Sequence, residues 1–266
     1  GTHMGIDVGS VSVKIVLIGN DGIEFSDYRL SDGKPIDTLR SMLSDMNGNT
    51  GDSQISSIGI TGSGRNFLGK IVGADTIINE ISAQVKAAKF IMPDVDTVME
   101  IGGQDAKFMR IEDGRATTFE MNRVCAAGTG AFLQEQAARL NVDLQTEFAA
   151  EAFKSKNPAD LGARCTVFME SDLVSHQQMG CSKSDLIAGL SLSVITNYTE
   201  KVVSGNTIGD KVLFLGGVAE NPAIVAALES KLGRPVFIST VGKLSGAIGA
   251  ALAAAESQSV AQTRKT

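Results

Sequence analysis

The 266-residue sequence contains no tryptophan, two histidines and only three cysteines. So few cysteines, without regular spacing, argue against the disulfide framework of a small secreted protein and favour a reducing, cytoplasmic location. Gly1–His3 reads as a tag remnant with Met4 as the natural start, so His176 is the single native histidine. A metal site of the His-x-x-x-His kind is therefore excluded.

Long apolar runs and an excess of positive charge are also missing. No stretch approaches the about 20 apolar residues that a membrane helix needs, and no signal peptide is recognisable. The formal charge of −6 offers no basic surface to nucleic acid or to an anionic membrane. With 43% hydrophobic and 20% charged residues, the chain is expected to be globular, as one large domain or two lobes.

An internal repeat is the most informative feature of what is present. A shift of about 93 residues lays Asp7–Ser10 on Glu100–Gly103. A second match lays Ile58–Gly62 on Leu213–Gly217, and both matches fall where a strand is expected to end. Two copies of one strand–turn–strand device predict two similar lobes, each offering a loop to one ligand between them.

The hydrophobic pattern predicts alternating strands and helices. Helices are expected after two of the cysteines, over 128–140 and 166–179, and a long buried helix over 184–206. The alanine-rich stretch 244–254 is expected to pack close to a sheet, and 257–266 to form a disordered tail. The fold class that follows is α/β.

Two kinds of chemistry lie close together near the middle of the chain. Glycines at 102 and 103 let a triphosphate approach the backbone, while the carboxylate of Asp105 can face its magnesium. Twenty residues after Asp105, Cys125 comes directly before a helix, where the positive end of the helix dipole favours a thiolate. This proximity suggests a nucleotide site coupled to a metal or redox group.

The motifs together resemble the activators of 2-hydroxyacyl-CoA dehydratases, within the BadF/BadG/BcrA/BcrD-type ATPase family. The resemblance runs from about Gly5 to Ala254 and rests on five motifs, which are Asp7-x-Gly9-Ser10, Gly102-Gly103-Gln104-Asp105, Cys125-Ala-Ala-Gly128-Thr-Gly130, Arg164-Cys165-Thr166-Val167-Phe168 and Gly216-Gly217-Val218-Ala219-x-Asn221. The two cysteine motifs are the specific part. The phosphate loops alone would indicate only the wider actin, hexokinase and heat-shock-chaperone superfamily.

The resemblance implies a two-lobed actin/hexokinase/chaperone-like ATPase fold with duplicated mixed β-sheet lobes and the nucleotide in the cleft between them. The expected boundaries are 4–92 with 245–258 for lobe I and 93–244 for lobe II, with 259–266 as a disordered tail.

The resemblance also implies the role of individual residues. The expected first phosphate loop contains Asp7, Gly9 and Ser10, with Lys14 nearby. The expected second phosphate loop contains Gly102, Gly103, Gln104 and Asp105. The expected adenosine pocket contains Gly216, Gly217 and Asn221. Asp7 and Asp105 would serve Mg²⁺, and Gln104 would orient the attacking water. Cys125 and Cys165 would ligate an iron–sulfur cluster, whereas Cys181 is expected to be structural.

Cluster stoichiometry favours a homodimer. A 4Fe-4S cubane needs about four thiolates, and only two of the three cysteines precede helices, so two chains related by a two-fold axis would supply one complete set. The function implied is an ATP-dependent one-electron reductase that uses ATP binding and hydrolysis to ADP to drive electron transfer to a partner iron–sulfur enzyme. A 2-hydroxyacyl-CoA dehydratase is the expected acceptor, with a ferredoxin or flavodoxin as donor.

Other readings stay open at this point. The acceptor could also be a double-cubane-cluster protein or the core of benzoyl-CoA reductase. A small-molecule sugar kinase of the same superfamily would need a carboxylate base beside a sugar hydroxyl, and a filament ATPase of the actin kind would need no cluster. Neither of these two classes explains the cysteine motifs.

Overall fold

The computed structural model describes residues 1–49, 54–122, 126–163 and 166–263. This part of the chain forms two compact units. Unit 1 combines Gly1–Pro93 with Asp113–Ala116 and Lys243–Thr266, and unit 2 combines Asp94–Glu112 with Thr117–Gly242. The lobe boundaries expected from the sequence stay a prediction.

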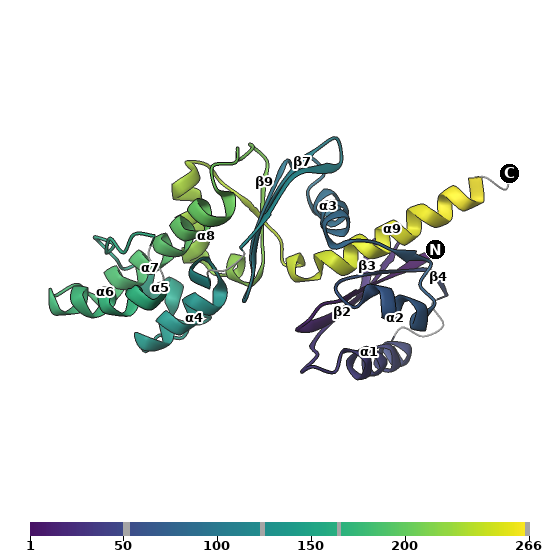
Figure 1. The fold of residues 1–266 in the computed structure, drawn as a ribbon, viewed down its shortest axis with the longest axis horizontal. Helices are drawn as coiled ribbons and strands as arrows, with labels where there is room; N and C mark the ends of the chain where they lie inside the picture. The colour runs from purple at the N-terminus through teal and green to yellow at the C-terminus, as the bar shows by residue number, and fades with distance from the viewer. Residues whose placement is uncertain (50–53, 123–125, 164–165, 264–266) are drawn as a thin grey trace. The chain divides into compact units, whose positions relative to one another are not determined.

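Unit 1 is built on a five-stranded mixed sheet in the order β3-β2-β1-β4-β5 (Figure 1). The strands are β1 (Thr2–Val8), β2 (Ser12–Gly19), β3 (Gly22–Leu30), β4 (Ile55–Thr61) and β5 (Thr76–Ile77). β1 pairs antiparallel with β2 and parallel with β4. β1 begins at Thr2, so the residues regarded as a tag remnant continue the strand, and His3 pairs with Ile18.

The two faces of this sheet carry different helices. Alternate residues of β1, among them Ile6, enter a core shared with α1 (Pro35–Asn49) and α2 (Arg65–Val72). The opposite face packs against α9 (Ser245–Thr263), which also contacts α3 (Glu80–Ile91). The sheet of unit 1 therefore separates two helical layers.

Glycine makes the contact between α9 and the sheet possible. A Cβ atom at Gly5 or at Gly59 would collide with the backbone of α9, at Ala247 and Ala250 respectively. Because these helix positions are alanines and the strand positions are glycines, the two backbones approach closely. The close packing expected for the alanine-rich stretch is confirmed.

The C-terminal segment differs from the expectation of disorder, because α9 continues to Thr263. Its last turns are held by side-chain contacts with the rest of unit 1. Lys86 forms an ion pair with Glu256, and Gln258 Nε2 donates to Ser56 O at 3.0 Å. Tertiary contacts of this kind order a segment whose polar composition suggests a tail.

Unit 2 repeats the sheet of unit 1 with the order β10-β9-β6-β7-β8. Its strands are β6 (Thr97–Ile101), β7 (Ala106–Glu112), β8 (Arg115–Met121), β9 (Val212–Leu215) and β10 (Phe237–Ile238). β6 pairs antiparallel with β7 and parallel with β9, as β1 does with β2 and β4. The duplicated mixed sheet predicted from the repeat, and with it the two-lobe α/β fold class, is confirmed.

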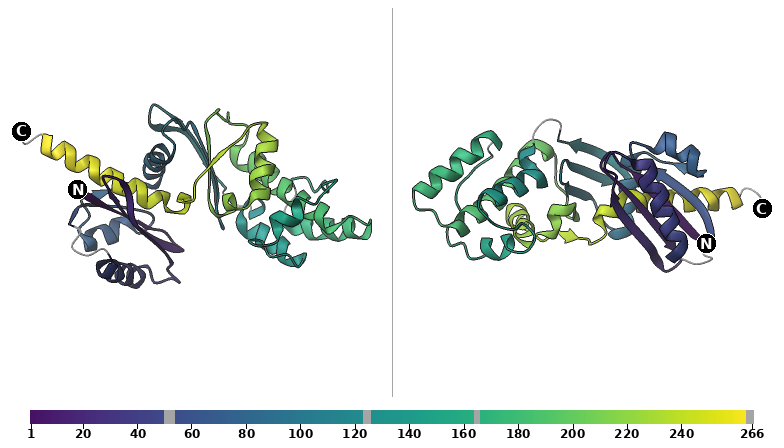
Figure 2. Two further views of the ribbon diagram at one scale, coloured as in Figure 1. Left: turned by 180° about the vertical axis from the view of Figure 1, so that it is seen from behind. Right: turned by 90° about the horizontal axis from the view of Figure 1, so that it is seen from below.

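The helices of unit 2 gather on one side of its sheet, as the teal and green ribbons of Figure 2 show. They are α4 (Gly130–Arg139), α5 (Phe148–Ala152), α6 (Thr166–Gln178), α7 (Lys183–Tyr198) and α8 (Pro222–Leu232). The core between them contains the fully buried Phe108, Phe132, Phe148 and Phe214. The long helix expected over 184–206 is α7 followed by a π-helical turn, Thr199–Val203, which ends where Ser204 adopts a left-handed conformation.

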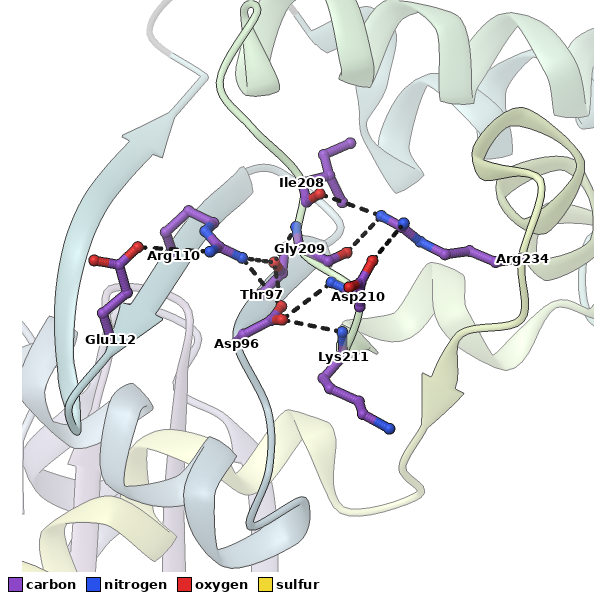
Figure 3. A network of polar contacts seen from close by, with 9 residues as sticks. All are labelled: Asp96, Thr97, Arg110, Glu112, Ile208, Gly209, Asp210, Lys211 and Arg234. Carbon is purple, nitrogen blue, oxygen red and sulfur yellow. Dashed lines mark hydrogen bonds and ion pairs between the residues drawn. The ribbon is translucent and has the colours of Figure 1, made fainter.

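A polar network fixes the segment that leads into β9 (Figure 3). Asp96 accepts hydrogen bonds from the backbone amides of Asp210 and Lys211 and pairs with Arg110 at 3.1 Å. Arg234 donates to the carbonyls of Ile208 and Gly209. The start of β9 is thus anchored to β6, β7 and the end of α8.

None of the helices in the described part of the chain is long and apolar enough to cross a membrane.

Candidate nucleotide site

The second expected phosphate loop is a tight turn at the end of β6. The amide of Gly102 donates to the carbonyl of Asp105 at 2.8 Å, which closes the turn. A Cβ at Gly102 would lie 2.8 Å from Asp105 Oδ1 and 3.1 Å from Asp105 O, so a side chain at this position would force Asp105 to shift. Nothing lies within 4 Å of a Cβ built on Gly103, which leaves that backbone open to a ligand.

The carbonyls of this loop are bound to the start of α4. The amides of Gly130 and Ala131 donate to Gly102 O and Gly103 O, both at 2.8 Å. These donors belong to the first turn of the helix, where amides have no partner within the helix. The loop is therefore joined directly to the segment that follows Cys125.

The expected adenosine motif begins at the end of β9. Gly216 has φ of +96°, and a Cβ there would collide with the backbone of Ile101, so the position requires glycine. Asn221 caps α8, because its Oδ1 accepts from Ala223 N at 3.0 Å, and its Nδ2 donates to Leu144 O at 3.1 Å. Pro222 opens the helix at its first position, as the sequence indicates.

One pocket of unit 2 brings the phosphate loop and the adenosine motif together. Its volume is about 580 Å³, within the range of sites that hold a cofactor-sized ligand. The lining residues are Gly103, Gln104, Gly130, Ala131, Leu133, Gln134, Leu144, Gln145, Gly217, Val218, Glu220 and Asn221. Four of the expected site residues line it, which are Gly103, Gln104, Gly217 and Asn221; Gly102, Asp105 and Gly216 do not.

Three polar side chains of this pocket were not expected from the sequence. Gln134 lies on α4, Gln145 on the loop after it, and Glu220 on the 3₁₀ turn Gly217–Glu220. No motif marks the two glutamines, because helix and loop packing alone brings them to the pocket. Glu220 could have been noticed, since it lies inside the adenosine motif.

Lys107, on β7, lies beside the second phosphate loop. Its side chain is only 15% exposed, and its Nζ lies 3.2 Å from Asp105 Oδ2 and 3.9 Å from Glu100 Oε1. Its carbonyl accepts from the hydroxyl of Tyr198 at 2.6 Å. Burial raises the pKa of Tyr198 well above its ordinary value, so this tyrosine stays a neutral donor.

The first expected phosphate loop lies in unit 1 between β1 and β2. The amide of Gly9 donates to Ser12 O at 3.0 Å, which makes the turn tight, and Ser10 at its tip is exposed. Asp7, the last residue but one of β1, forms an ion pair with Lys14 at 3.1 Å, with side chains 16% and 14% exposed. The structure thus brings Asp7, Gly9, Ser10 and Lys14 together in unit 1.

The oxygen atoms near Asp7 suit a hard cation such as Mg²⁺. Thr61 lies directly opposite Asp7 in the neighbouring strand, and its fully buried hydroxyl has no hydrogen-bond partner in the structure. Mg²⁺ in nucleotide sites prefers one or two carboxylates together with phosphate and water oxygens. Among the described residues, no group of three or more metal-ligating side chains is assembled.

The two expected cluster ligands, Cys125 and Cys165, lie outside the described residues. The chain after each of them enters a helix. A 3₁₀ turn, Ala126–Gly128, leads into α4, and α6 begins at Thr166. Cys181, between α6 and α7, is partly buried, and burial raises the pKa of its thiol.

Comparison with solved structures gives two levels of similarity. The activator of 2-hydroxyisocaproyl-CoA dehydratase from Clostridium difficile with bound ADPNP has a TM-score of 0.83 and 33% identity, covering 99% of this chain and 98% of that one. A ROK family glucokinase from Streptomyces griseus, in complex with glucose and AMPPNP, has a TM-score of 0.63 at 13% identity, covering 96% and 100%. The second likeness concerns the fold alone.

Sequence comparison is more specific. The (R)-2-hydroxyglutaryl-CoA dehydratase activating ATPase of Acidaminococcus fermentans is 36% identical over 255 residues, which are 94% of this chain and 95% of the relative. Residues 4–254 match the BadF/BadG/BcrA/BcrD ATPase family. The chain therefore belongs to the BadF/BadG/BcrA/BcrD ATPase family.

Proposed function

We propose that this protein is an ATP-dependent one-electron reductase that activates a partner iron–sulfur enzyme, with a 2-hydroxyacyl-CoA dehydratase as the acceptor. It would act as a homodimer that holds one 4Fe-4S cluster, and a ferredoxin or flavodoxin would supply the electron. Relatives of similar length named as activators of 2-hydroxyacyl-CoA dehydratases support the choice of partner.

The observation that carries the proposal is the pair of hydrogen bonds between the second phosphate loop and α4. The carbonyls of Gly102 and Gly103 accept from the first turn of this helix, and Cys125 lies a few residues before it. A shift of the loop on ATP binding or phosphate release would therefore move the helix and the segment that precedes it. Such coupling is what an ATP-driven electron donor needs.

In the pocket of unit 2, Gly103, Gly217 and Asn221 would contact the nucleotide. In unit 1, Gly9, Ser10 and Lys14 would form a phosphate-binding loop. Gln104 would orient the attacking water. Asp7 and Asp105 would hold Mg²⁺, which neutralises phosphate charge when bound.

Cys125 and Cys165 would hold the cluster, which supplies one-electron chemistry when bound. Four thiolates require two chains, and an exposed apolar side chain near Cys165 supports an interface there. Phe168, in the first turn of α6, is 59% exposed. Large exposed apolar residues of this kind are frequent where protein surfaces meet.

Anaerobic purification followed by iron, sulfide and visible-absorbance analysis tests the proposal. The wild-type dimer should be brown with about four irons per two chains. Cys125→Ala and Cys165→Ala should each lose the colour while still binding ADPNP. The matched control is Cys181→Ala, which should keep both colour and iron.

Two results would contradict the proposal. One is a colourless wild-type protein after strictly anaerobic handling. The other is a normal iron content in either the Cys125 or the Cys165 variant.

A further inference from the structure

Four strands of unit 1 align a row of polar side chains. Cross-strand register places Thr61 opposite Asp7, Asp7 opposite Lys14, and Lys14 opposite Tyr28. Residues directly opposite one another in neighbouring strands point to the same face of a sheet. The row therefore lies on the face that packs against α9.

In the middle of this row, two glycines pack closely against the carboxylate of Asp7. A Cβ at Gly62 would lie 2.6 Å from Asp7 Oδ1, and a Cβ at Gly246 would lie 2.5 Å from Asp7 Oδ2. The first turn of α9, which contains Gly246, therefore packs directly on the carboxylate. At one end of the row, the buried hydroxyl of Thr61 has no hydrogen-bond partner among the described residues, so it can bond to a ligand oxygen.

At the other end of the row, two lysines share one aromatic ring. Lys243, three residues before Gly246, has its Nζ 5.6 Å from the centroid of Tyr28, and Lys14 Nζ lies 5.9 Å from the same centroid. Lys14 is paired with Asp7, whereas Lys243 forms no ion pair within the described ranges. Two ammonium groups lie near the Tyr28 ring, whereas the row itself contains one carboxylate, Asp7, so this end of the row carries an excess of positive charge.

We propose that Lys243 is a second phosphate-binding lysine of this chain and that Tyr28 positions it. The ligand class is the terminal phosphates of a nucleoside triphosphate, so the inference rests on the proposed ATPase function. An ammonium group offers three donors and a compact charge to phosphate oxygens. The Tyr28 ring, which Lys14 also approaches, holds the Lys243 ammonium through a cation–π interaction, for which the phenol hydroxyl is not needed.

Titration of the full-length protein with ADPNP, and separately with adenosine, tests this role. Lys243→Gln should weaken ADPNP binding about tenfold or more, the effect of losing a charge-assisted hydrogen bond. Adenosine binding should not change, because the adenosine motif lines the pocket of unit 2. Lys243→Arg should restore most of the affinity, since the guanidinium keeps the charge.

Tyr28 is tested with a matched pair. Tyr28→Phe keeps the ring and should bind ADPNP as the wild type does, whereas Tyr28→Leu should weaken binding about threefold. Lys70→Gln, an exposed lysine of α2, makes the same change of net charge and should leave the affinity unchanged.

The outcomes separate this inference from the proposed function. If the wild type binds ADPNP and Lys243→Gln binds it equally well, the role of Lys243 is refuted while the ATPase proposal stands. Equal losses of ADPNP and adenosine affinity would also refute it, since they indicate damage to the fold. If the wild type binds no ADPNP at all, the proposed function itself is wrong.

Discussion

The amide of Gly130 donates a hydrogen bond of 2.8 Å to the carbonyl of Gly102, which links the turn after β6 to the first turn of α4. Gly130 also faces Val218, one of the residues that line the nucleotide pocket. A single backbone contact thus connects the expected phosphate loop, the wall of the pocket and the helix that follows Cys125. Substitutions at this contact should affect stability and nucleotide binding together.

Gly130→Ala should lower the free energy of unfolding by about 1 kcal/mol, because overpacking against two backbone atoms outweighs the helix propensity that alanine gains over glycine. The added Cβ would lie 3.1 Å from Gly102 O and from Val218 Cγ2, and 3.3 Å from Gly103 Cα. ADPNP binding should weaken as well, because the loop must shift to relieve these contacts. Urea unfolding and calorimetric titration measure the two effects.

Gly103→Ala is the matched comparison within the same loop. Its Cβ would meet nothing within 4 Å, so unfolding should be unchanged, but the methyl group would occupy the pocket wall and weaken ADPNP binding. If Gly103→Ala lowers the free energy of unfolding as much as Gly130→Ala does, then any side chain added to this loop is destabilising. The contact with α4 would then not be the cause.

The sequence predicts the parts of this fold that depend on repeated local patterns. The repeat of Asp7–Ser10 at Glu100–Gly103 predicts two sheets of the same order, and Asn221-Pro222 predicts the start of α8. These patterns are visible because turn glycines and helix caps have local causes. The short helix α2 was missed, since its N-cap, Gly64, makes no side-chain hydrogen bond.

The candidate site is predictable only where its residues belong to motifs. Gly103, Gln104, Gly217 and Asn221 were expected and line one pocket, whereas Gln134 reaches it only through the packing of α4. The ion pair of Lys107 with Asp105 was missed for a similar reason. It depends on which side chains the β6–β7 turn brings together, and no local pattern encodes that.

Gln104→Ala should slow ATP hydrolysis about 100-fold or more while leaving ADPNP affinity within about twofold. Gln104 lines the pocket from the phosphate loop and is exposed there, as a residue that orients a water must be. Steady-state hydrolysis and titration separate the two quantities. Gln134 lines the same pocket but lies on α4, so Gln134→Ala is the control. It should alter KM without lowering kcat. An unchanged kcat in the Gln104 variant would remove Gln104 from this role.

Asp96→Ala should lower the free energy of unfolding by about 1–3 kcal/mol, because it leaves donors without an acceptor. Burial alone would raise the pKa of Asp96, but hydrogen bonds from Thr97 and from the amides of Lys211 and Asp210, together with Arg110, outweigh it and lower the pKa. The carboxylate is therefore charged at neutral pH and holds the segment before β9 (Figure 3).

Urea unfolding measures the effect, and Asp94→Ala is the control. Asp94 is an exposed carboxylate just before Asp96, paired only with the exposed side chain of Lys211, and a pair of that kind contributes little to stability. Equal destabilisation by the two substitutions would contradict the role given to the network.

Asp185→Asn should remove part of the resistance of unit 2 to acid. Asp185 Oδ1 accepts from Ser155 Oγ at 2.6 Å and from the amides of Lys156 and Asn157, both at 3.1 Å. These hydrogen bonds, led by that of Ser155, lower the pKa of Asp185 from 3.8 to about 2. A carboxylate whose pKa is lower in the folded state stabilises that state above its unfolded pKa, and the contribution disappears as pH falls through the folded pKa.

The wild type should therefore be more stable than Asp185→Asn at pH 7 and at pH 4, and the difference should shrink between pH 4 and pH 2. Urea unfolding at pH 7, 4, 3 and 2 tests this, with Asp160→Asn, an exposed carboxylate further along the same connection, as control. A stability difference that stays constant from pH 7 to pH 2 would mean that the charge of Asp185 does not hold this segment.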